Sequence, residues 1–452
     1  MKKLIFNLSS LFFIWMMQSQ TNPAITSWVQ NSSGITGRHY VSGNPTPITD
    51  AVLANVQSVK YSTNWVYVTT NGIPAYITGP FLDGNPSLAT TQNGAIFKMP
   101  LNPTQNTGTA TATSGGNIGI FRNGVALFDY RDGVSWKNST SQICGGPIMG
   151  CTGDGKWNRD AVVGERGGFD CSKAHPAMGN YHHHQNPSAF NLDLVVISTV
   201  CSTYPSDGLY VIDSNQHSPL LGYAYDGFPI YGAYAYANTD GTGGIVRMKS
   251  GYQYRNITTR TVWADGTDVL DGPAVNATYP LGYFREDYEF IAHPSDQSYL
   301  DIHNGRFCVT PEYPLGIYCY FTTVDANHNS AYPYVVGPTF YGNKTAVKVT
   351  SIAETTTTYN PLLSASAFET NQYKVSVYPN PATDFIAVQT PMTIKDLKVD
   401  LIDTLGKIIQ SKTIIQGSTL CVFETDTVYN GIYFIRINDN NQLKTYKVII
   451  DK

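Results

Sequence analysis

The chain has 452 residues and is 42% hydrophobic but only 14% charged. A sizeable core can therefore form, and Thr, Ser, Asn, Gly and Tyr must cover much of the surface, because charged residues usually make up about 25% of a protein. The net charge of −4 at pH 7 excludes the basic footprint of a typical nucleic-acid-binding protein. The 40 glycines, 25 prolines and 31 tyrosines favour a turn-rich, mainly β protein. The length favours two or three domains.

The first 20 residues have the pattern of a secretory signal peptide. Lys2 and Lys3 precede an apolar run over 11–17, and a polar stretch follows. The apolar run is too short to span a bilayer, so we predict an exported protein without a transmembrane segment in the mature chain. Export permits disulfides, and the seven cysteines suggest three local pairs with one thiol left over. These are Cys144–Cys151, Cys171–Cys201 and Cys308–Cys319, with Cys421 unpaired.

Residues 21–115 are rich in Thr, Asn and Pro and contain short alternating runs. Asn64–Thr70 is the clearest strand, because Asn71-Gly72 after it is a turn signal. We predict that 21–115 form the N-terminal β-rich part of the main domain, and separate folding of this part stays open. Residues 116–350 hold most of the chemically interesting side chains and predict a central β-rich domain with long loops.

Three consecutive histidines, His182, His183 and His184, form the most informative stretch of this central region. The Asn-Pro pair that follows at 186–187 argues against a helix. In an extended chain successive side chains point to opposite faces, so His182 and His184 share a face with Cα atoms about 6.5–7 Å apart. Two imidazoles at this spacing can bind one metal ion at ~2.0–2.1 Å, and His183 points away.

Distant segments offer further ligands for such an ion. A third histidine and a carboxylate, together with water, would make an open, catalytic-type zinc site that activates the water for hydrolysis. Zinc or copper suits a histidine cluster, whereas calcium would prefer carboxylate oxygens. We therefore predict a divalent metal ion and, as one function open to it, metal-dependent hydrolysis of an extracellular substrate. The predicted ligands are His175, His182, His184, His303 and Asp301, and the catalytic candidates are Asp226 and Glu312.

Other interpretations of the same residues remain open. The histidines can instead hold turns together through hydrogen bonds, and Asp226-Gly227-Phe228-Pro229 is first of all a turn signal. Arg306 can pair with Glu312 or bind an anionic substrate group. Familiar nucleophile and phosphate-loop motifs are missing, so the sequence leaves open whether the protein is an enzyme. The tyrosine-rich run 231–236 favours a second function, a non-enzymatic carbohydrate-binding or adhesive surface module.

The composition changes towards the C-terminus. Residues 351–372 are rich in Thr, Ser and Ala and predict a linker. From 373 to 452 lysine becomes frequent, and short runs such as Gly431–Ile437 alternate strictly between apolar and polar residues. Closely spaced alternating strands predict a small antiparallel β-sandwich.

This last part of the chain resembles the C-terminal sorting domain of the type IX secretion system. The residues that carry the resemblance are Tyr378–Asp384, Leu401–Lys407, Asn430–Ile435 and the terminal strand over 444–452. The resemblance implies passage through the inner membrane by the signal peptide and export through the outer membrane by the type IX machinery, commonly with removal of this domain. The expected location is the cell surface or the exterior.

Residues 116–345 resemble the YHYH-domain family. The matching segments are Trp157–Ala161, Phe169-Asp170, Ala174–Pro176, Tyr181–His184, Asn186-Pro187, His217–Pro219, Asp226–Gly232, Asp301–Arg306 and Pro311–Pro314. The naming motif Tyr-His-Tyr-His is here Tyr181-His182-His183-His184, so its two histidines correspond to His182 and His184. His183 stands where the family has Tyr. The family has no established activity, so the resemblance implies membership of the family without indicating a reaction.

Overall fold

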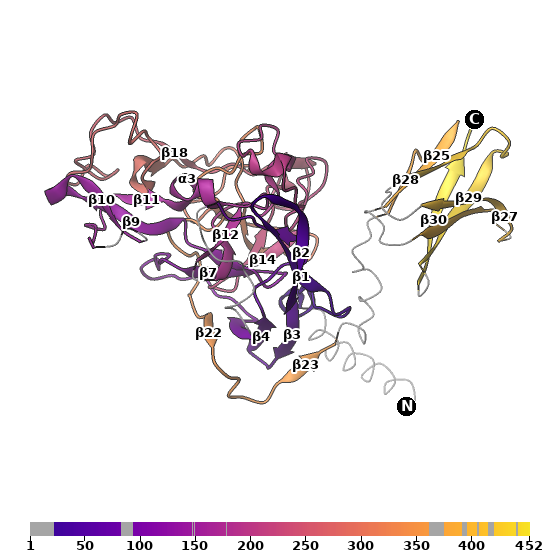
Figure 1. The fold of residues 1–452 in the computed structure, drawn as a ribbon, viewed down its shortest axis with the longest axis horizontal. Helices are drawn as coiled ribbons and strands as arrows, with labels where there is room; N and C mark the ends of the chain where they lie inside the picture. Colours follow the sequence, from indigo (N-terminus) through magenta and orange to yellow (C-terminus); the bar gives the residue numbers. More distant parts are fainter. Residues whose placement is uncertain are drawn as a thin grey trace, which may run out of the picture. The chain divides into compact units, whose positions relative to one another are not determined.

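A computed structural model describes residues 22–82, 94–146, 148, 150–177, 179–360, 375–390, 396–404, 406–414, 420–439 and 442–452. The predicted signal peptide and residues 361–372 of the predicted linker lie outside these ranges. The described chain is mainly β, as predicted, and it divides into two compact units at residue 360 (Figure 1). No helix among the described residues is long and apolar enough to cross a membrane.

A mixed eight-stranded sheet forms the centre of the first unit, in the order β12-β13-β8-β7-β14-β15-β21-β20. Its strands are β7 (Asn117–Phe121), β8 (Ala126–Phe128), β12 (Ala174–Ala177), β13 (Asn180–His183), β14 (Leu220–Ala224), β15 (Pro229–Tyr231), β20 (Gly305–Cys308) and β21 (Ile317–Phe321). Every residue of β14 is buried. Gly222 is needed there, because a Cβ atom would lie 2.2 Å from the carbonyl oxygen of Ile120 on β7. The histidine-bearing strands β12 and β13 lie at one edge.

A second, five-stranded sheet joins both ends of this unit, in the order β22-β6-β4-β3-β23. Its strands are β3 (Val56–Tyr61), β4 (Trp65–Thr70), β6 (Ala95–Pro100), β22 (Val347–Val349) and β23 (Thr357–Tyr359). The strand predicted over 64–70 is β4. Val59 and Phe97 of this sheet share one hydrophobic core with Tyr223 and Phe321 of the central sheet. The N-terminal part therefore packs into the same core as the central region.

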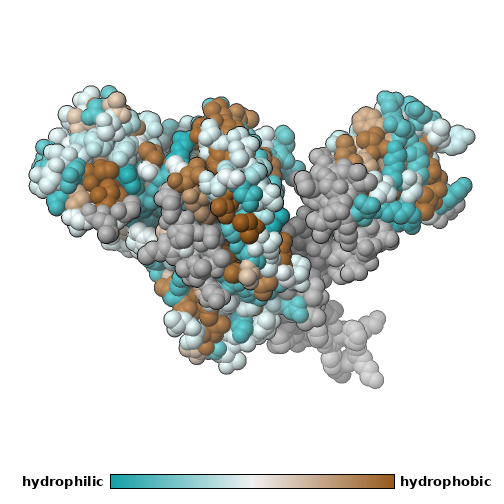
Figure 2. All heavy atoms as spheres, in the orientation of Figure 1, coloured by the Kyte–Doolittle hydropathy of each residue, from teal (hydrophilic) through white to brown (hydrophobic). Residues whose placement is uncertain are grey.

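Smaller elements complete the first unit. They are the sheet β2-β1-β5 with β1 (Thr36–Val41), β2 (Asn44–Leu53) and β5 (Ile77–Thr78); the sheet β10-β9-β11 with β9 (Arg131–Lys137), β10 (Gln142–Gly145) and β11 (Asn158–Asp160); the hairpins β16 (Tyr234–Tyr236) with β17 (Ile245–Arg247) and β18 (Tyr252–Tyr254) with β19 (Tyr288–Phe290); and the helices α2 (Pro23–Thr26) and α3 (Ala161–Gly164). On the face shown in Figure 2, hydrophobic residues form separate patches among pale and hydrophilic ones. This surface agrees with the low fraction of charged residues.

Two of the three predicted disulfides are present, Cys144–Cys151 and Cys171–Cys201. The predicted Cys308–Cys319 bond is wrong for this structure, in which both thiols are free and buried. Cys308 on β20 lies opposite Ile317 and diagonal to Cys319, and the two thiols interact without a disulfide between them. Cys421 is also free, as predicted.

The second unit contains two antiparallel sheets, β24-β25-β28 and β27-β26-β29-β30. Its strands are β24 (Ser376–Tyr378), β25 (Phe385–Gln389), β26 (Leu397–Ile402), β27 (Ile408–Ile414), β28 (Leu420–Glu424), β29 (Gly431–Asp439) and β30 (Gln442–Ile450). Val388 and Phe423 from the first sheet share a core with Leu401 and Ile435 from the second. The predicted small antiparallel sandwich is therefore confirmed.

Candidate metal centre

The structure brings three histidines together at the edge of the central sheet. The antiparallel pairing of β12 with β13 places His175 directly opposite His182, and His184 follows at the end of β13. One ring nitrogen of each histidine lies within 4.8 Å of the others, and all three side chains are buried. Among the His, Cys, Asp and Glu side chains of the described residues, these three form a group close enough to share a metal ion. A buried group of this kind can hold a metal ion.

Backbone carbonyls fix the tautomers of two of these rings. His182 Nδ1 lies 2.7 Å from the carbonyl oxygen of Asn180, and His184 Nδ1 lies 2.5 Å from that of Asp129. A carbonyl oxygen only accepts hydrogen bonds, so both Nδ1 atoms carry the hydrogen and each neutral ring has its lone pair on Nε2. These hydrogen bonds orient the rings as carbonyl partners orient the histidine ligands of metal sites.

The two Nε2 atoms of His182 and His184 face each other at 3.0 Å. Two lone pairs at this distance repel unless a proton or a cation lies between them. Burial and the neighbouring rings of His184 and His175 hold the pKa of His182 well below its usual range, so a proton is disfavoured. Two ligand atoms bound tetrahedrally at ~2.0–2.1 Å lie about 3.3 Å apart. The observed separation therefore suits a shared metal ion.

Glu165 places a carboxylate beside two of the three rings, which the sequence analysis missed. The Oε2 atom of Glu165 lies 3.2 Å from His175 Nε2 and 3.1 Å from His184 Nε2. The Glu165 side chain is 20% exposed, whereas the side chains of the two histidines are at most 5% exposed. Burial raises the pKa of this carboxyl, but its neighbours His175 and His184 outweigh burial and hold the pKa below its usual range. Three imidazole nitrogens and one carboxylate oxygen form a donor set typical of zinc.

A single helical turn carries Glu165 to this position. Glu165 directly follows α3, and its backbone N–H donates to the carbonyl of Ala161. Asp160 caps the start of α3, accepting from the backbone N–H of Val162 at 2.8 Å and from the hydroxyl of Tyr334 at 2.8 Å. The segment Trp157–Ala161, singled out from the sequence, therefore supports a ligand instead of containing one.

His183 points to the opposite face, as predicted. Its Nε2 lies 2.9 Å from the hydroxyl of Tyr76, and its ring meets Phe121 edge-on at 5.5 Å between centroids. Burial lowers the pKa of His183 to about 3, so the ring is neutral at physiological pH. His183 is thus a core residue on the far side of the strand from the three clustered rings.

Neighbouring buried groups hold the two histidine-bearing strands in place. Asp170 accepts hydrogen bonds from the backbone of Gly79 at 2.9 Å, from the hydroxyl of Tyr181 at 2.9 Å and from the backbone of Ala174 at 3.2 Å. The Cys171–Cys201 disulfide closes the loop that contains all three clustered histidines. The centre is therefore held by contacts from three segments of the chain.

The structure places His303 and Asp301 elsewhere. His303 Nδ1 lies 2.7 Å from the hydroxyl of Thr339. Asp301 accepts from the hydroxyl of Tyr318 at 2.9 Å and begins a tight turn, in which Asn304 has a φ of 64°. The segment is a turn rather than a strand, so the shared face expected from the Asp-x-His spacing does not form.

Asp226 and Glu312 also have separate partners. Asp226 is buried and accepts from the hydroxyl of Tyr320 at 2.5 Å, and burial raises the pKa of Asp226 to about 6. Glu312 is exposed and accepts from the hydroxyl of Tyr231 at 2.8 Å. Arg306, expected to pair with Glu312 or an anion, donates instead to the carbonyl oxygens of neighbouring loops, at 2.6 Å in the case of Gln297.

The comparison with known families is consistent with the centre described above. The family described as YHYH protein matches residues 96–333, more than half of the chain, and this range contains all four clustered donors. The chain belongs to the YHYH protein family. Both YHYH histidines of the naming motif, at 182 and 184, are therefore members of the cluster.

A second family, the secretion system C-terminal sorting domain, matches residues 376–451. Both resemblances found in the sequence are thereby confirmed. The sorting domain indicates processing by the type IX machinery and secretion across the outer membrane to the cell surface or the exterior. No curated protein matches this YHYH protein.

Proposed function

We propose that this secreted YHYH protein binds one divalent transition-metal ion through His175, His182, His184 and Glu165. The observation that carries the proposal is the 3.0 Å approach of two Nε2 atoms whose Nδ1 partners are committed to carbonyl oxygens. Zinc or copper suits three imidazoles and one carboxylate, whereas calcium would require more oxygen ligands.

We further propose that the ion supports hydrolysis of an extracellular substrate, with Glu165 as the base. Of the four donors, Glu165 has the greatest exposed fraction, so the metal is approached from its side. A carboxylate there would be placed to accept the proton of a water molecule, and a bound ion would supply the lowered pKa of that water. Asp226, Glu312, Asp301 and His303 have no part in this proposal, because each is engaged in another hydrogen-bond cluster.

The variant Glu165→Gln separates the two proposals. Metal content and hydrolysis of the activated ester p-nitrophenyl acetate are measured for the secreted protein, with His183→Ala as the control. A base role predicts that Glu165→Gln retains metal and loses ester hydrolysis, while His183→Ala retains both. Unchanged hydrolysis in Glu165→Gln contradicts the base role, and a metal-free wild-type protein contradicts the metal site itself.

The alternative function, carbohydrate binding at the protein surface, cannot use the tyrosine-rich run 231–236 from which it was predicted. In the run 231–236, Tyr231 is fully buried and Tyr234 is only 9% exposed. Their rings pack in the interior and offer no platform for a sugar. An exposed tyrosine, Tyr254, lies instead on the hairpin of β18 and β19.

A further inference from the structure

A groove of about 740 Å³ lies beside the segments that carry two of the metal donors. Arg166, which directly follows Glu165, and Gln185, which directly follows His184, both line it. Its other walls come from the β18–β19 hairpin and from residues 324–334. The volume is within the range of pockets that bind small molecules or a few units of a polymer.

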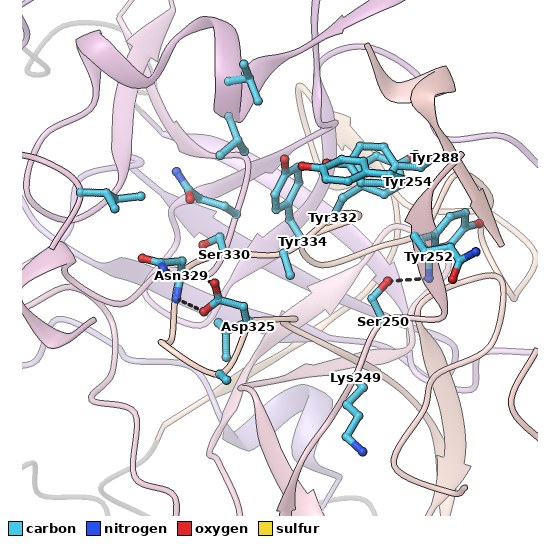
Figure 3. Close-up of a pocket in the computed structure, with 18 of the residues that line it drawn as sticks. Lys249, Ser250, Tyr252, Tyr254, Tyr288, Asp325, Asn329, Ser330, Tyr332 and Tyr334 are labelled. Carbon is cyan, nitrogen blue, oxygen red and sulfur yellow. Dashed lines mark hydrogen bonds between the residues drawn. The ribbon is translucent and has the colours of Figure 1, made fainter. Parts of the chain in front are cut away.

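One wall of the groove is a stack of tyrosine rings. Tyr254 on β18 lies opposite Tyr288 on β19, with ring centroids 4.9 Å apart, and Tyr288 stacks on Tyr332 at 4.0 Å. Figure 3 shows these three rings overlapping (Figure 3). Tyr254 ends the stack and is 54% exposed. A flat ring with a polar edge suits the apolar face of a sugar, whose hydroxyl groups point sideways into water.

The charged groups of the groove are mostly positive. Arg166, Arg247 and Lys249 line it, against a single acidic residue, Asp325. The carboxylate of Asp325 is engaged locally by the backbone and side chain of Asn329, at 2.9 and 3.2 Å. Lys249 also pairs with Asp296 at 3.2 Å, but both side chains are more than a third exposed, so solvent screens this pair. The local positive charge contrasts with the net charge of −4 of the whole chain.

A buried amide also faces the groove. Gln185 is only 2% exposed, and its Nε2 has no hydrogen-bond partner among the described residues. An amide left without a partner in a buried position destabilises the folded protein. A ligand with acceptor oxygens would satisfy it, and the groove gives such a ligand access.

We infer that this groove binds an acidic polysaccharide, with a sugar ring stacked on Tyr254, its carboxylate or sulfate groups near Lys249 and Arg247, and an oxygen accepting from Gln185. The tyrosine stack accounts for the sugar, the three cations account for the acidic groups, and the unpartnered amide accounts for a bound oxygen. The inference is independent of the metal proposal, because none of the four donors belongs to the binding surface.

Binding of three soluble polymers to the full-length protein tests the inference. Polygalacturonate carries carboxylates, dextran sulfate carries sulfates, and dextran is the neutral counterpart of dextran sulfate. Titration calorimetry at physiological salt is expected to show binding of at least one of the acidic polymers and none of dextran. The polymer that binds shows whether the groove recognises carboxylates or sulfates.

Matched variants place the binding in the groove. Tyr254→Ala is expected to weaken binding about two- to tenfold, whereas Phe307→Ala, an aromatic residue 60% exposed outside the groove, leaves it unchanged. Lys249→Ala is expected to weaken it about tenfold, and the exposed Lys156→Ala serves as its control. Equal binding of dextran, no binding of either acidic polymer, or equal effects of the groove variants and their controls would each overturn the inference. Since binding is measured without turnover, a metal-free or inactive protein leaves this test intact.

Discussion

The Cys171–Cys201 disulfide is expected to stabilise the first unit more than the Cys144–Cys151 disulfide does. The first closes a loop of 30 residues and the second a loop of seven. In the chain-entropy model the longer loop stabilises the folded state by about 3.6 kcal/mol and the shorter by about 2.4 kcal/mol. Cys171 and Cys144 are both fully buried, but Cys201 is buried in a hydrophobic cluster while Cys151 is partly exposed, so lost packing acts in the same direction as loop length. The difference in unfolding free energy should therefore be at least about 1.2 kcal/mol.

Urea-induced unfolding of the two double-alanine variants measures this difference. We expect Cys171→Ala/Cys201→Ala to be the less stable variant. It should also bind metal more weakly, because the loop closed by this disulfide contains His175, His182 and His184. The Cys144→Ala/Cys151→Ala variant should keep the metal affinity of the wild type. Equal destabilisation of both variants, or equal metal affinity, would refute the reasoning.

Three further predictions concern groups around the centre. Lys173→Met leaves the buried carboxylate of Asp193 without its partner at 2.7 Å, so this variant should lose about 3–5 kcal/mol of unfolding free energy in a urea titration. The double variant Lys173→Met/Asp193→Leu should recover most of this loss, because it removes the unpaired carboxylate as well. No recovery would contradict the account. Asp160→Ala removes the cap of α3, so it should lose about 1 kcal/mol of unfolding free energy and bind metal more weakly. Asp160→Asn should show smaller losses of both. Wild-type metal affinity in Asp160→Ala would argue against positioning of Glu165 by α3. Ligand histidines must be neutral, and burial and the neighbouring rings lower the pKa of His182. Metal affinity measured by competition with a chelator should therefore stay constant from pH 8 to below 6 and fall only in more acidic buffer. A fall in affinity already between pH 8 and 7 would contradict ligation by these buried histidines.

Local patterns in the sequence were sufficient for much of the fold. Strict alternation predicted the C-terminal sandwich, and the Asn-Gly turn marked the end of β4. The alternation of side chains along an extended strand placed His182 and His184 on one face and His183 on the other. Each of these inferences depends on a few neighbouring residues, which is why sequence alone supports them.

The features that the sequence did not predict depend on how distant segments of the chain pair with one another. Glu165 reaches the centre because α3 turns the chain beside β12 and β13, and no spacing from the histidines indicates this. Cys308 and Cys319 lie on paired strands, but the register places Ile317 opposite Cys308. His303 has the same spacing from Asp301 as His184 has from His182, yet its segment forms a turn. Register and turns are set by the whole fold, beyond any single motif.

The metal content of the secreted protein tests the central claim most directly. Protein recovered without chelators is analysed by elemental mass spectrometry, together with the His182→Ala/His184→Ala and His183→Ala variants. His182 and His183 are adjacent and equally buried, so the control loses a comparable ring from the opposite face. The account predicts about one zinc or copper ion per chain in the wild type and in His183→Ala, and none in the double variant. Wild-type protein without metal, or a double variant that keeps it, would contradict the account.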